Sequence, residues 1–207
     1  MDSASREAHW QNVYTTKGEN EVSWFQENPA PSLELLTFVK ATPKSVVIDI
    51  GGGASRLVDV LVSQGYDDVT VLDLSEAALA TARMRLASKG EHVKWVAADV
   101  TAWEPAQLSD VWHDRAAFHF LTEPDEQRHY ADRIQRGLRP GGHLIIGTFA
   151  LDGPEKCSGL PVARHDAKSL AVVFGDAFVL LDTRRHEHAT PWDASQRFQF
   201  STFQFRP

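Results

Sequence analysis

A ten-residue segment, VVIDIGGGAS at positions 46–55, constrains the fold of this chain more than any other stretch. An apolar run ends there on an acid, three glycines follow, and residues 56–64 have the spacing of an amphipathic helix. A second apolar run, 69–72, ends on Asp73. Strand, glycine-rich turn, helix and strand in this order predict an α/β sheet with a nucleoside-shaped slot at the carboxyl ends of its strands.

Asp49 indicates which ligand suits this slot. It stands two residues before Gly51, where a dinucleotide would carry its pyrophosphate, and a carboxylate so close to a phosphate is repelled. S-adenosylmethionine instead presents an α-ammonium and a sulfonium, which are both cationic. The dinucleotide fingerprint also requires a third glycine at the position that Arg56 occupies here. We therefore expect S-adenosylmethionine rather than NAD; the remaining alternative is a glycine-rich turn in an unrelated α/β protein.

Strands and helices alternate along most of the chain and so predict its fold class. The predicted helices cover 31–40, 56–64, 76–88 and 124–138, and the predicted strands cover 45–50, 69–72, 93–97, 110–113, 143–149, 178–181 and 197–205. This alternation indicates a doubly wound, mostly parallel sheet. The last two strands are joined by a polar loop instead of a helix, so we expect them to pair antiparallel.

Four phenylalanines in the last predicted strand leave its surroundings open. Phe198 and Phe200 share one parity along the strand, whereas Phe203 and Phe205 share the other. Because successive side chains of a strand point to opposite faces, either the strand is buried on both faces or a bulge lies near Ser201.

The composition limits the number of domains and the kinds of partner. With 207 residues and no Pro-, Gly- or Ser-rich linker, the chain fits one domain, 1–207. Its 21 basic and 28 acidic residues give a formal charge of −7, which opposes binding to nucleic acid. A single cysteine, a polar N-terminus and the lack of any apolar run of roughly 20 residues predict a cytoplasmic protein that does not enter a membrane.

The predicted contacts to S-adenosylmethionine follow from the glycine turn. Gly51 and Gly53 would let the backbone approach the ligand, and the first amides of the following helix would donate to the methionine carboxylate. The carboxylate of Asp49 would accept the α-ammonium.

The adenosine part of the ligand is expected at the next two strand ends. Asp73 follows Gly53 by 20 residues, the position of a carboxylate that accepts both ribose hydroxyls, and its neighbour Leu74 is assigned to the same site. Asp99 would hold the adenine amino group, with Val100 against the ring.

With these features the chain resembles the class I S-adenosylmethionine-dependent methyltransferases over roughly 45–149. The resemblance implies a seven-stranded sheet whose last strand is antiparallel and inserted beside the fifth. It implies three parts of one domain: leading helices with an aromatic lid, 1–40; a cofactor-binding core, 45–150; and a substrate-side loop with antiparallel strands, 151–207. The motif departs from many members at Ser55, where they have a further glycine.

Two shorter segments resemble narrower groups within that family. His9 and Trp10, then VSWFQ at 22–26, resemble the tryptophan-rich lid of thiopurine methyltransferases, and WHDRA at 112–116 resembles their WDRG segment with one residue inserted. Similar segments occur in lysine methyltransferases that act on elongation factor 1A and citrate synthase, and residues 187–205 are faintly similar to tellurite-resistance methyltransferases. The resemblance implies a small acceptor, a thiol or other chalcogen compound.

The aromatic residues of the N-terminal part have two possible roles. Trp10, Tyr14 and Trp24 would contact the cofactor as a lid, since aromatic faces attract cations and a closed lid excludes water. Alternatively, the tryptophans simply pack a leading helix onto the sheet.

His113, Asp114 and Arg115 are the predicted catalytic residues, because the fourth strand delivers them to the ligand-binding edge of the sheet. His113 or Asp114 would be the base for an amine acceptor, whereas a thiolate needs little help from a base. The alternative is an ion pair between Asp114 and Arg115 that fixes the loop, with His113 contacting only the cofactor.

Other candidate residues carry weaker predictions. Cys157 lies in a loop where such enzymes contact substrate, but no activating partner is visible, so an idle thiol is the favoured interpretation. His186 and His188 alternate on a predicted strand, yet the sequence offers no third ligand and we expect no metal. Together the features predict a methyltransferase for a small soft nucleophile; the alternatives are a protein lysine N-methyltransferase and a cofactor-binding module without catalysis.

Overall fold

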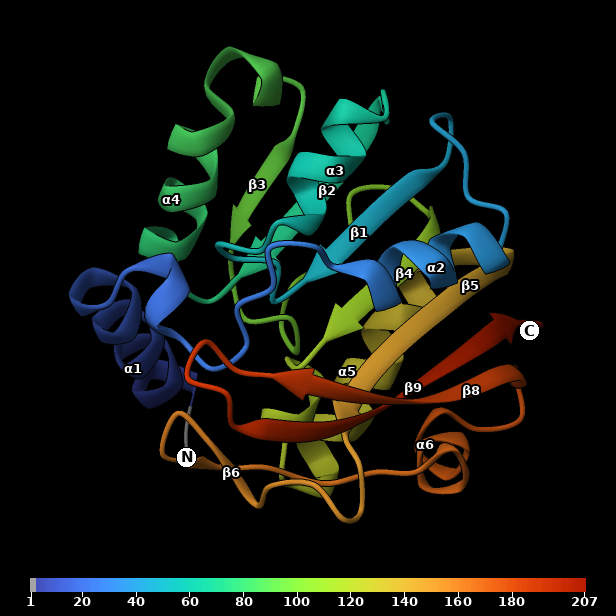
Figure 1. The fold of residues 1–207 in the computed structure, drawn as a ribbon. Coiled ribbons are helices and arrows are strands. Elements are labelled where there is room, and N and C mark those ends of the chain that lie inside the picture. The colour runs from blue at the N-terminus through green and yellow to red at the C-terminus, as the bar shows by residue number, and fades with distance from the viewer. Residues whose placement is uncertain (1–2) are drawn as a thin grey trace.

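The computed structural model describes residues 3–207, which form a seven-stranded sheet with helices on both faces (Figure 1). The strands are β1 Val46–Ile50, β2 Asp68–Asp73, β3 Lys94–Ala97, β4 Ser109–Arg115, β5 Leu138–Phe149, β8 Phe178–Ala189 and β9 Ser195–Phe205, with a separate pair β6 Lys156–Cys157 and β7 Leu160–Pro161. The helices are α1 Ser3–Thr16, α2 Ala30–Phe38, α3 Leu57–Ser63, α4 Glu76–Leu86, α5 Pro124–Gly137 and α6 Ala167–Phe174, with short 3₁₀ turns η1 Glu19–Glu21, η2 Ala87–Gly90 and η3 Phe118–Phe120.

The order of the strands confirms the predicted fold class. Across the sheet they run β3-β2-β1-β4-β5-β9-β8. The first five pair in parallel, and β9 lies antiparallel between β5 and β8. This is the inserted antiparallel last strand that the family resemblance implies.

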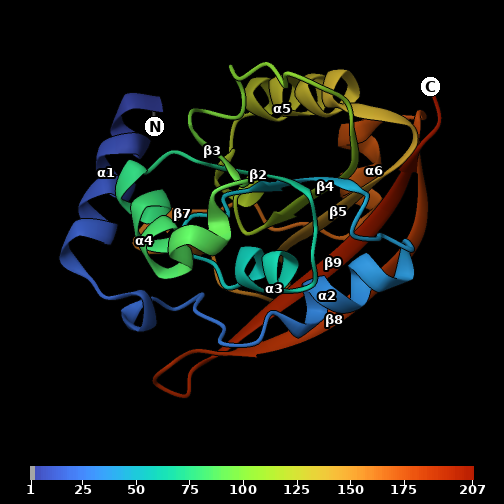
Figure 2. The same ribbon diagram turned by 90° about the horizontal axis from the view of Figure 1, so that it is seen from above.

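Two hydrophobic layers hold the helices against the sheet (Figure 2). On one face α2, α3 and α4 pack against side chains such as Val47, Val69 and Val111. On the other face α5 and α6 pack against side chains such as Ile48 and Ile146. Because Val47 and Ile48 are adjacent in β1, the strand is apolar on both faces, which explains its near-continuous apolar run.

The phenylalanines of β9 are buried on both faces of the sheet. Phe198 and Phe200 are buried in the layer of α2 and α3, whereas Phe203 and Phe205 are buried in the layer of α5 and α6. The strand is therefore buried on both faces, and its pairing with β5 runs without a register shift. A shift occurs instead in the β8–β9 pairing, between Leu180 and Asp182.

Most predicted element boundaries lie within a few residues of those observed, but the last third of the chain differs. The strand predicted at 178–181 continues to Ala189, so only residues 190–194 connect it to β9. Helix α6 was not predicted; Asp166 caps it by accepting from the backbone of Ser169. The helix predicted from residue 56 begins at Leu57, whose amide donates to the hydroxyl of Ser55.

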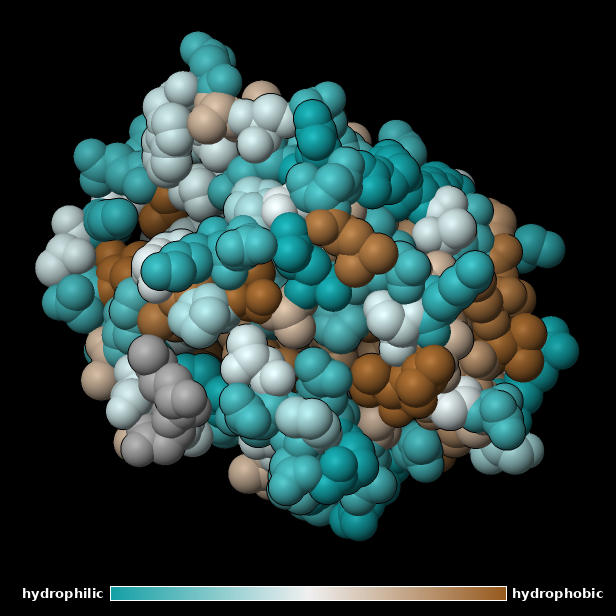
Figure 3. All heavy atoms as spheres, turned by 90° about the horizontal axis from the view of Figure 1, so that it is seen from below, coloured by the Kyte–Doolittle hydropathy of each residue, from teal (hydrophilic) through white to brown (hydrophobic). Residues whose placement is uncertain are grey.

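Between residues 3 and 207 no helix is both long enough and apolar enough to cross a membrane. Figure 3 shows one face of the molecule, on which hydrophobic side chains form patches between hydrophilic ones.

Candidate functional site

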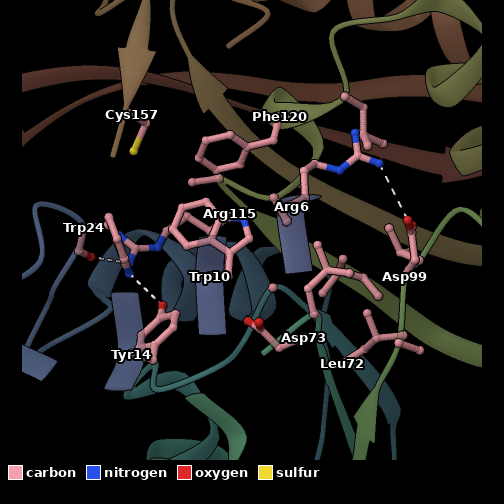
Figure 4. Close-up of a pocket in the computed structure, with 18 of the residues that line it drawn as sticks. Arg6, Trp10, Tyr14, Trp24, Leu72, Asp73, Asp99, Arg115, Phe120 and Cys157 are labelled. Carbon is pink, nitrogen blue, oxygen red and sulfur yellow. Dashed lines mark hydrogen bonds and ion pairs between the residues drawn. The ribbon is translucent and has the colours of Figure 1, made fainter. Parts of the chain in front are cut away.

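A cavity lies at the carboxyl ends of β1 to β4, where the sequence places the ligand (Figure 4). Its empty volume is about 840 Å³, including open space at its mouth. We call it the main cavity; its walls include Trp10, Asp73, Asp99, Arg115, Cys157 and Phe198. A smaller hollow extends it over the glycine turn and is called the side arm; it is lined by Ser32, Asp49, Gly52, Ser55 and His113, and it shares Tyr14, Trp24, Gly51 and Arg115 with the main cavity.

Asp73 brings a buried carboxylate to the wall of the main cavity. Its side chain is 8% exposed, and its Oδ1 accepts a hydrogen bond from the amide of Ser75 at 2.8 Å. Burial raises the pKa of Asp73 to about 7, and the negative charge of Asp49 adds to the rise. A carboxylate that is costly to keep charged gains from a ligand that donates hydrogen bonds to it. Leu74 lines the same wall.

Asp99 also lines the main cavity, together with Val100, but its carboxylate already binds protein groups. Thr101 donates to Oδ1 from its amide and its hydroxyl, Ser3 donates to Oδ2, and the guanidinium of Arg6 lies 3.6 Å away. Burial alone would raise the pKa of Asp99, but these hydrogen bonds and the charge of Arg6 hold it below its ordinary value. Asp99 thus anchors α1 at the position where we expected it to hold adenine.

Four aromatic side chains cover the main cavity, and we call them the aromatic cover: Trp10, Tyr14, Trp24 and Phe120. The ring of Trp10 lies 4.9 Å from that of Phe120 and 5.5 Å from that of Trp24, and Trp24 Nε1 donates to the hydroxyl of Tyr14 at 3.0 Å. The tryptophans therefore pack the N-terminal segment onto the sheet and also line the cavity, while their contact with the cofactor as a lid stays a prediction.

Contacts from α1 to distant parts of the chain hold the aromatic cover in place. The side-chain oxygen of Gln11 accepts from the hydroxyl of Ser75 and from the amide of Ala77 at the start of α4. Arg6 forms an ion pair with Glu126 of α5. No local pattern in the sequence identifies Arg6, because its partners Asp99 and Glu126 are distant along the chain.

The glycine turn and Asp49 form the side arm. Gly51 has φ +65°, a conformation that favours glycine, and a Cβ on Gly52 would lie 2.6 Å from Asp49 Oδ2. The Asp49 side chain is 2% exposed. Its Oδ1 is hydrogen-bonded to Nδ1 of His113 at 2.7 Å, whereas its Oδ2 is buried and has no hydrogen-bond partner in the described part of the chain. A buried carboxylate oxygen without a partner fits a cationic ligand group.

The three residues predicted as catalytic do not all line the site. Side chains alternate along β4, so His113 and Arg115 point to the face of the site, whereas Asp114 points to the opposite face. Asp114 lines neither the main cavity nor the side arm. It accepts hydrogen bonds from the hydroxyl of Tyr130 and the amides of Ala117 and Phe118, so it fixes the turn after β4, and burial raises its pKa to about 6. We therefore do not propose Asp114 as a base.

Arg115 is bound to the N-terminal segment rather than to Asp114. Its guanidinium donates to Oε1 of Gln26 and to the carbonyl of Trp24, each at 2.6 Å, and among residues 3–207 no ion pair joins it to Asp114. Burial lowers the pKa of Arg115 to about 10, so the side chain remains a cation at neutral pH. It is a half-buried positive charge where the main cavity meets the side arm.

The far end of the main cavity is assembled from segments that are distant in sequence, and we call it the acceptor end. Cys157 comes from β6, Gln196 and Phe198 come from β9, Arg115 is the last residue of β4, and Phe120 comes from η3. Burial raises the pKa of the Cys157 thiol to about 11, so it is a neutral wall group. The Oε1 atom of Gln196 is buried without a partner in the described residues.

The two histidines of β8 have different surroundings. His188 is buried, and its Nε2 lies 2.7 Å from the carbonyl of Ser23 while its Nδ1 lies 3.4 Å from Nε2 of Gln26. It thus holds the segment that binds Arg115. His186 lines a different hollow, beside α2, and does not reach the site.

The known proteins that are similar to this chain include several methyltransferases. Residues 47–142 match the family model described as a methyltransferase domain. Thiocyanate methyltransferase 1 of Arabidopsis thaliana is 30% identical over 84% of this chain and 76% of its own. The malonyl-[acyl-carrier protein] O-methyltransferase of Paenibacillus is 33% identical over 53% of this chain, but the match spans only 40% of that relative, so this chain covers less than half of it. Among solved structures, an S-adenosylmethionine-dependent methyltransferase from Anabaena variabilis is similar with a TM-score of 0.76 over 99% of this chain and 95% of its own, at 14% identity.

Proposed function

Because this chain belongs to the S-adenosylmethionine-dependent methyltransferases, we propose that it transfers the methyl group of that cofactor to a small nucleophile, a thiol or other chalcogen compound. The cofactor would extend through the main cavity and the side arm. Its sulfonium supplies an activated methyl group for in-line displacement by the acceptor.

One observation supports the cofactor assignment above all others: Oδ2 of Asp49 is buried without a partner in the described residues. The α-ammonium of the cofactor would supply the missing charge and hydrogen bonds there. Gly52 leaves room for this approach, since a side chain at that position would overlap the carboxylate. Asp73 would accept the ribose hydroxyls. The residues present therefore fit S-adenosylmethionine.

The acceptor end supports a small soft nucleophile. Its walls are largely apolar or neutral, with Phe120, Phe198 and the protonated thiol of Cys157, and its one charged group is the guanidinium of Arg115. A nearby cation favours the thiolate form of an acceptor, which is the reactive form, without a separate base. The aromatic cover would exclude water and strengthen this attraction.

A protein lysine as acceptor has less support. Its ammonium would need acidic groups and a base, but Arg115 would repel it and Asp114 lies on the opposite face of the sheet. A module that binds the cofactor without catalysis also has less support, because the acceptor end places the guanidinium of Arg115 in the cavity wall. A cytoplasmic location and a small-molecule partner remain predictions from the sequence.

The test is release of S-adenosylhomocysteine by the purified protein, with small thiols, selenols and amines, and separately with a lysate of proteins, as acceptors. We expect turnover with a small thiol or selenol, and none in an Asp73→Ala variant. Methylation of lysate protein alone would contradict the small acceptor and support a lysine methyltransferase. Cofactor binding without turnover on any acceptor would support the non-catalytic alternative.

A further inference from the structure

We infer that His113 and Ser32 are positioning residues for the methyl donor: they hold the Asp49 carboxylate so that one oxygen is reserved for the α-ammonium. The inference rests on the proposed function, and it changes the role predicted for His113 from a base for the acceptor to a support for cofactor binding. The observations behind it are one pair of hydrogen bonds and the burial of all three side chains.

The pairing of β1 with β4 sets the first hydrogen bond. Asp49 and His113 are partners in the parallel register of these strands, so their side chains leave the same face of the sheet side by side. His113 Nδ1 lies 2.7 Å from Asp49 Oδ1, and Nε2 lies 2.8 Å from the hydroxyl of Ser32 in the first turn of α2. The imidazole is therefore fixed at both nitrogens.

This chain of hydrogen bonds leaves the two oxygens of Asp49 unequal. Oδ1 is occupied by His113, while Oδ2 is buried and unpartnered among the described residues. Without the imidazole the carboxylate would be free to rotate about its last bond, and no single oxygen would be held toward the side arm. Because a fixed acceptor loses little conformational freedom on binding, the arrangement favours the ligand group that reaches Oδ2.

The order Ser, His, Asp also occurs in hydrolases, but the burial of the serine excludes a nucleophilic role here. Ser32 is 1% exposed, and His113 and Asp49 are each 2% exposed. A nucleophilic serine must be open to its substrate, whereas Ser32 is buried in the wall of the side arm and its hydroxyl satisfies the second nitrogen of the ring. Its hydroxyl therefore completes the support of the imidazole.

Calorimetry with two ligands tests the inference on the whole chain. S-adenosylhomocysteine carries the α-ammonium, whereas 5′-methylthioadenosine has the same adenosine but no amino-acid tail. We expect His113→Leu to weaken S-adenosylhomocysteine binding about 10- to 100-fold, since a hydrogen bond to a charged group is lost, and to leave methylthioadenosine binding within about 2-fold. His113→Asn should recover most of the loss, because its amide still donates to Asp49. Ser32→Ala should cost about 2- to 5-fold.

A double-mutant cycle and a matched control sharpen the result. In an Asp49→Asn background, His113→Leu should cause no further loss of S-adenosylhomocysteine binding, because the group that it positions is already gone. The control His129→Leu changes an exposed histidine of α5 and should bind both ligands as the unaltered protein does. Equal losses for both ligands in His113→Leu, or no loss for either, would overturn the inference. Failure of the unaltered protein to bind either ligand would overturn the proposed function, and the inference with it.

Discussion

The cofactor-binding part of the site and its acceptor end are built in different ways. The three acids of the first come from one continuous stretch, residues 49–100, at or just after the ends of β1, β2 and β3: Asp49, Asp73 and Asp99. The second collects Arg115, Cys157 and Phe198 from three separate regions. A local motif therefore supplies the acids of the first, whereas only the complete tertiary structure brings the second together.

The largest expected effect concerns the cofactor-binding part. Asp73→Ala should weaken binding of S-adenosylhomocysteine by about 100-fold or more, because two hydrogen bonds from ribose to a carboxylate are lost. Calorimetry measures the change. Asp67→Ala, which removes an exposed acid paired with Lys44 near the other end of β2, is the matched control and should leave binding unchanged. Unchanged affinity in Asp73→Ala would remove this residue from the site.

The same residue should reduce the stability of the free protein, and the effect depends on pH. The pKa of Asp73 is raised from 3.8 to about 7 on folding, so the folded state binds the proton more tightly than the unfolded state. Its contribution to stability is thus fully present below about pH 4 and is lost as the pH rises through about 7. Asp73→Asn, which never carries the charge, should match the unaltered protein near pH 4 and exceed it at pH 8 by on the order of 2 kcal/mol.

Urea unfolding at the two pH values measures this difference. Groups that do not interact with Asp73 titrate equally in both proteins and cancel in the comparison. A stability difference that is the same at pH 4 and pH 8 would show that Asp73 is not a destabilising buried charge. Higher stability together with weaker cofactor binding would identify Asp73 as a residue kept for function.

The acceptor end should respond differently. Arg115→Leu should lower kcat/KM for a small thiol about 10- to 100-fold, since a half-buried charge close to the thiolate is lost, and should change the affinity for S-adenosylhomocysteine much less. Arg115→Lys keeps the charge and should retain more activity. Arg115 lines both the main cavity and the side arm. An equal loss of S-adenosylhomocysteine affinity would therefore assign Arg115 to the cofactor-binding part instead.

The smallest expected effect is that of Cys157→Ser. Burial raises the pKa of this thiol to about 11, so it carries no charge at neutral pH and provides only part of the wall. Activity on small thiols should change by no more than about 3-fold. A loss of more than about 10-fold would show that the thiol has a direct role.

The comparison also explains which parts of the site could be predicted from the sequence. Asp49 and Asp73 were found because an acid at a strand end beside glycines is a local signal. Asp114 was placed in the site although the alternation of side chains along β4, which is visible in the sequence, puts it on the opposite face from His113 and Arg115. That prediction used the position of the strand end and not the parity of the residue.

Other contacts had no local signal. Ser32 meets His113 across 81 positions, and Gln26 meets Arg115 across 89. Such pairs depend on how α2 and the N-terminal segment pack on the finished sheet, which the spacing of residues does not reveal. Helix α6 is a different case, because the sequence does contain signals for this helix. Asp166 is a typical helix cap, and Leu170 and Phe174 have the apolar spacing of a helix face.

The insertion of β9 between β5 and β8 has a consequence for synthesis on the ribosome. Within residues 3–207, strand β8 pairs only with β9, so a chain made up to residue 194 lacks the strand that β8 pairs with, and its cavity lacks Gln196 and Phe198. The segment that binds the cofactor, by contrast, has been made before half of the chain has emerged. Synthesis therefore produces the ligand-binding motif first and completes the acceptor end last. A prematurely terminated product would retain the motif without a complete acceptor end.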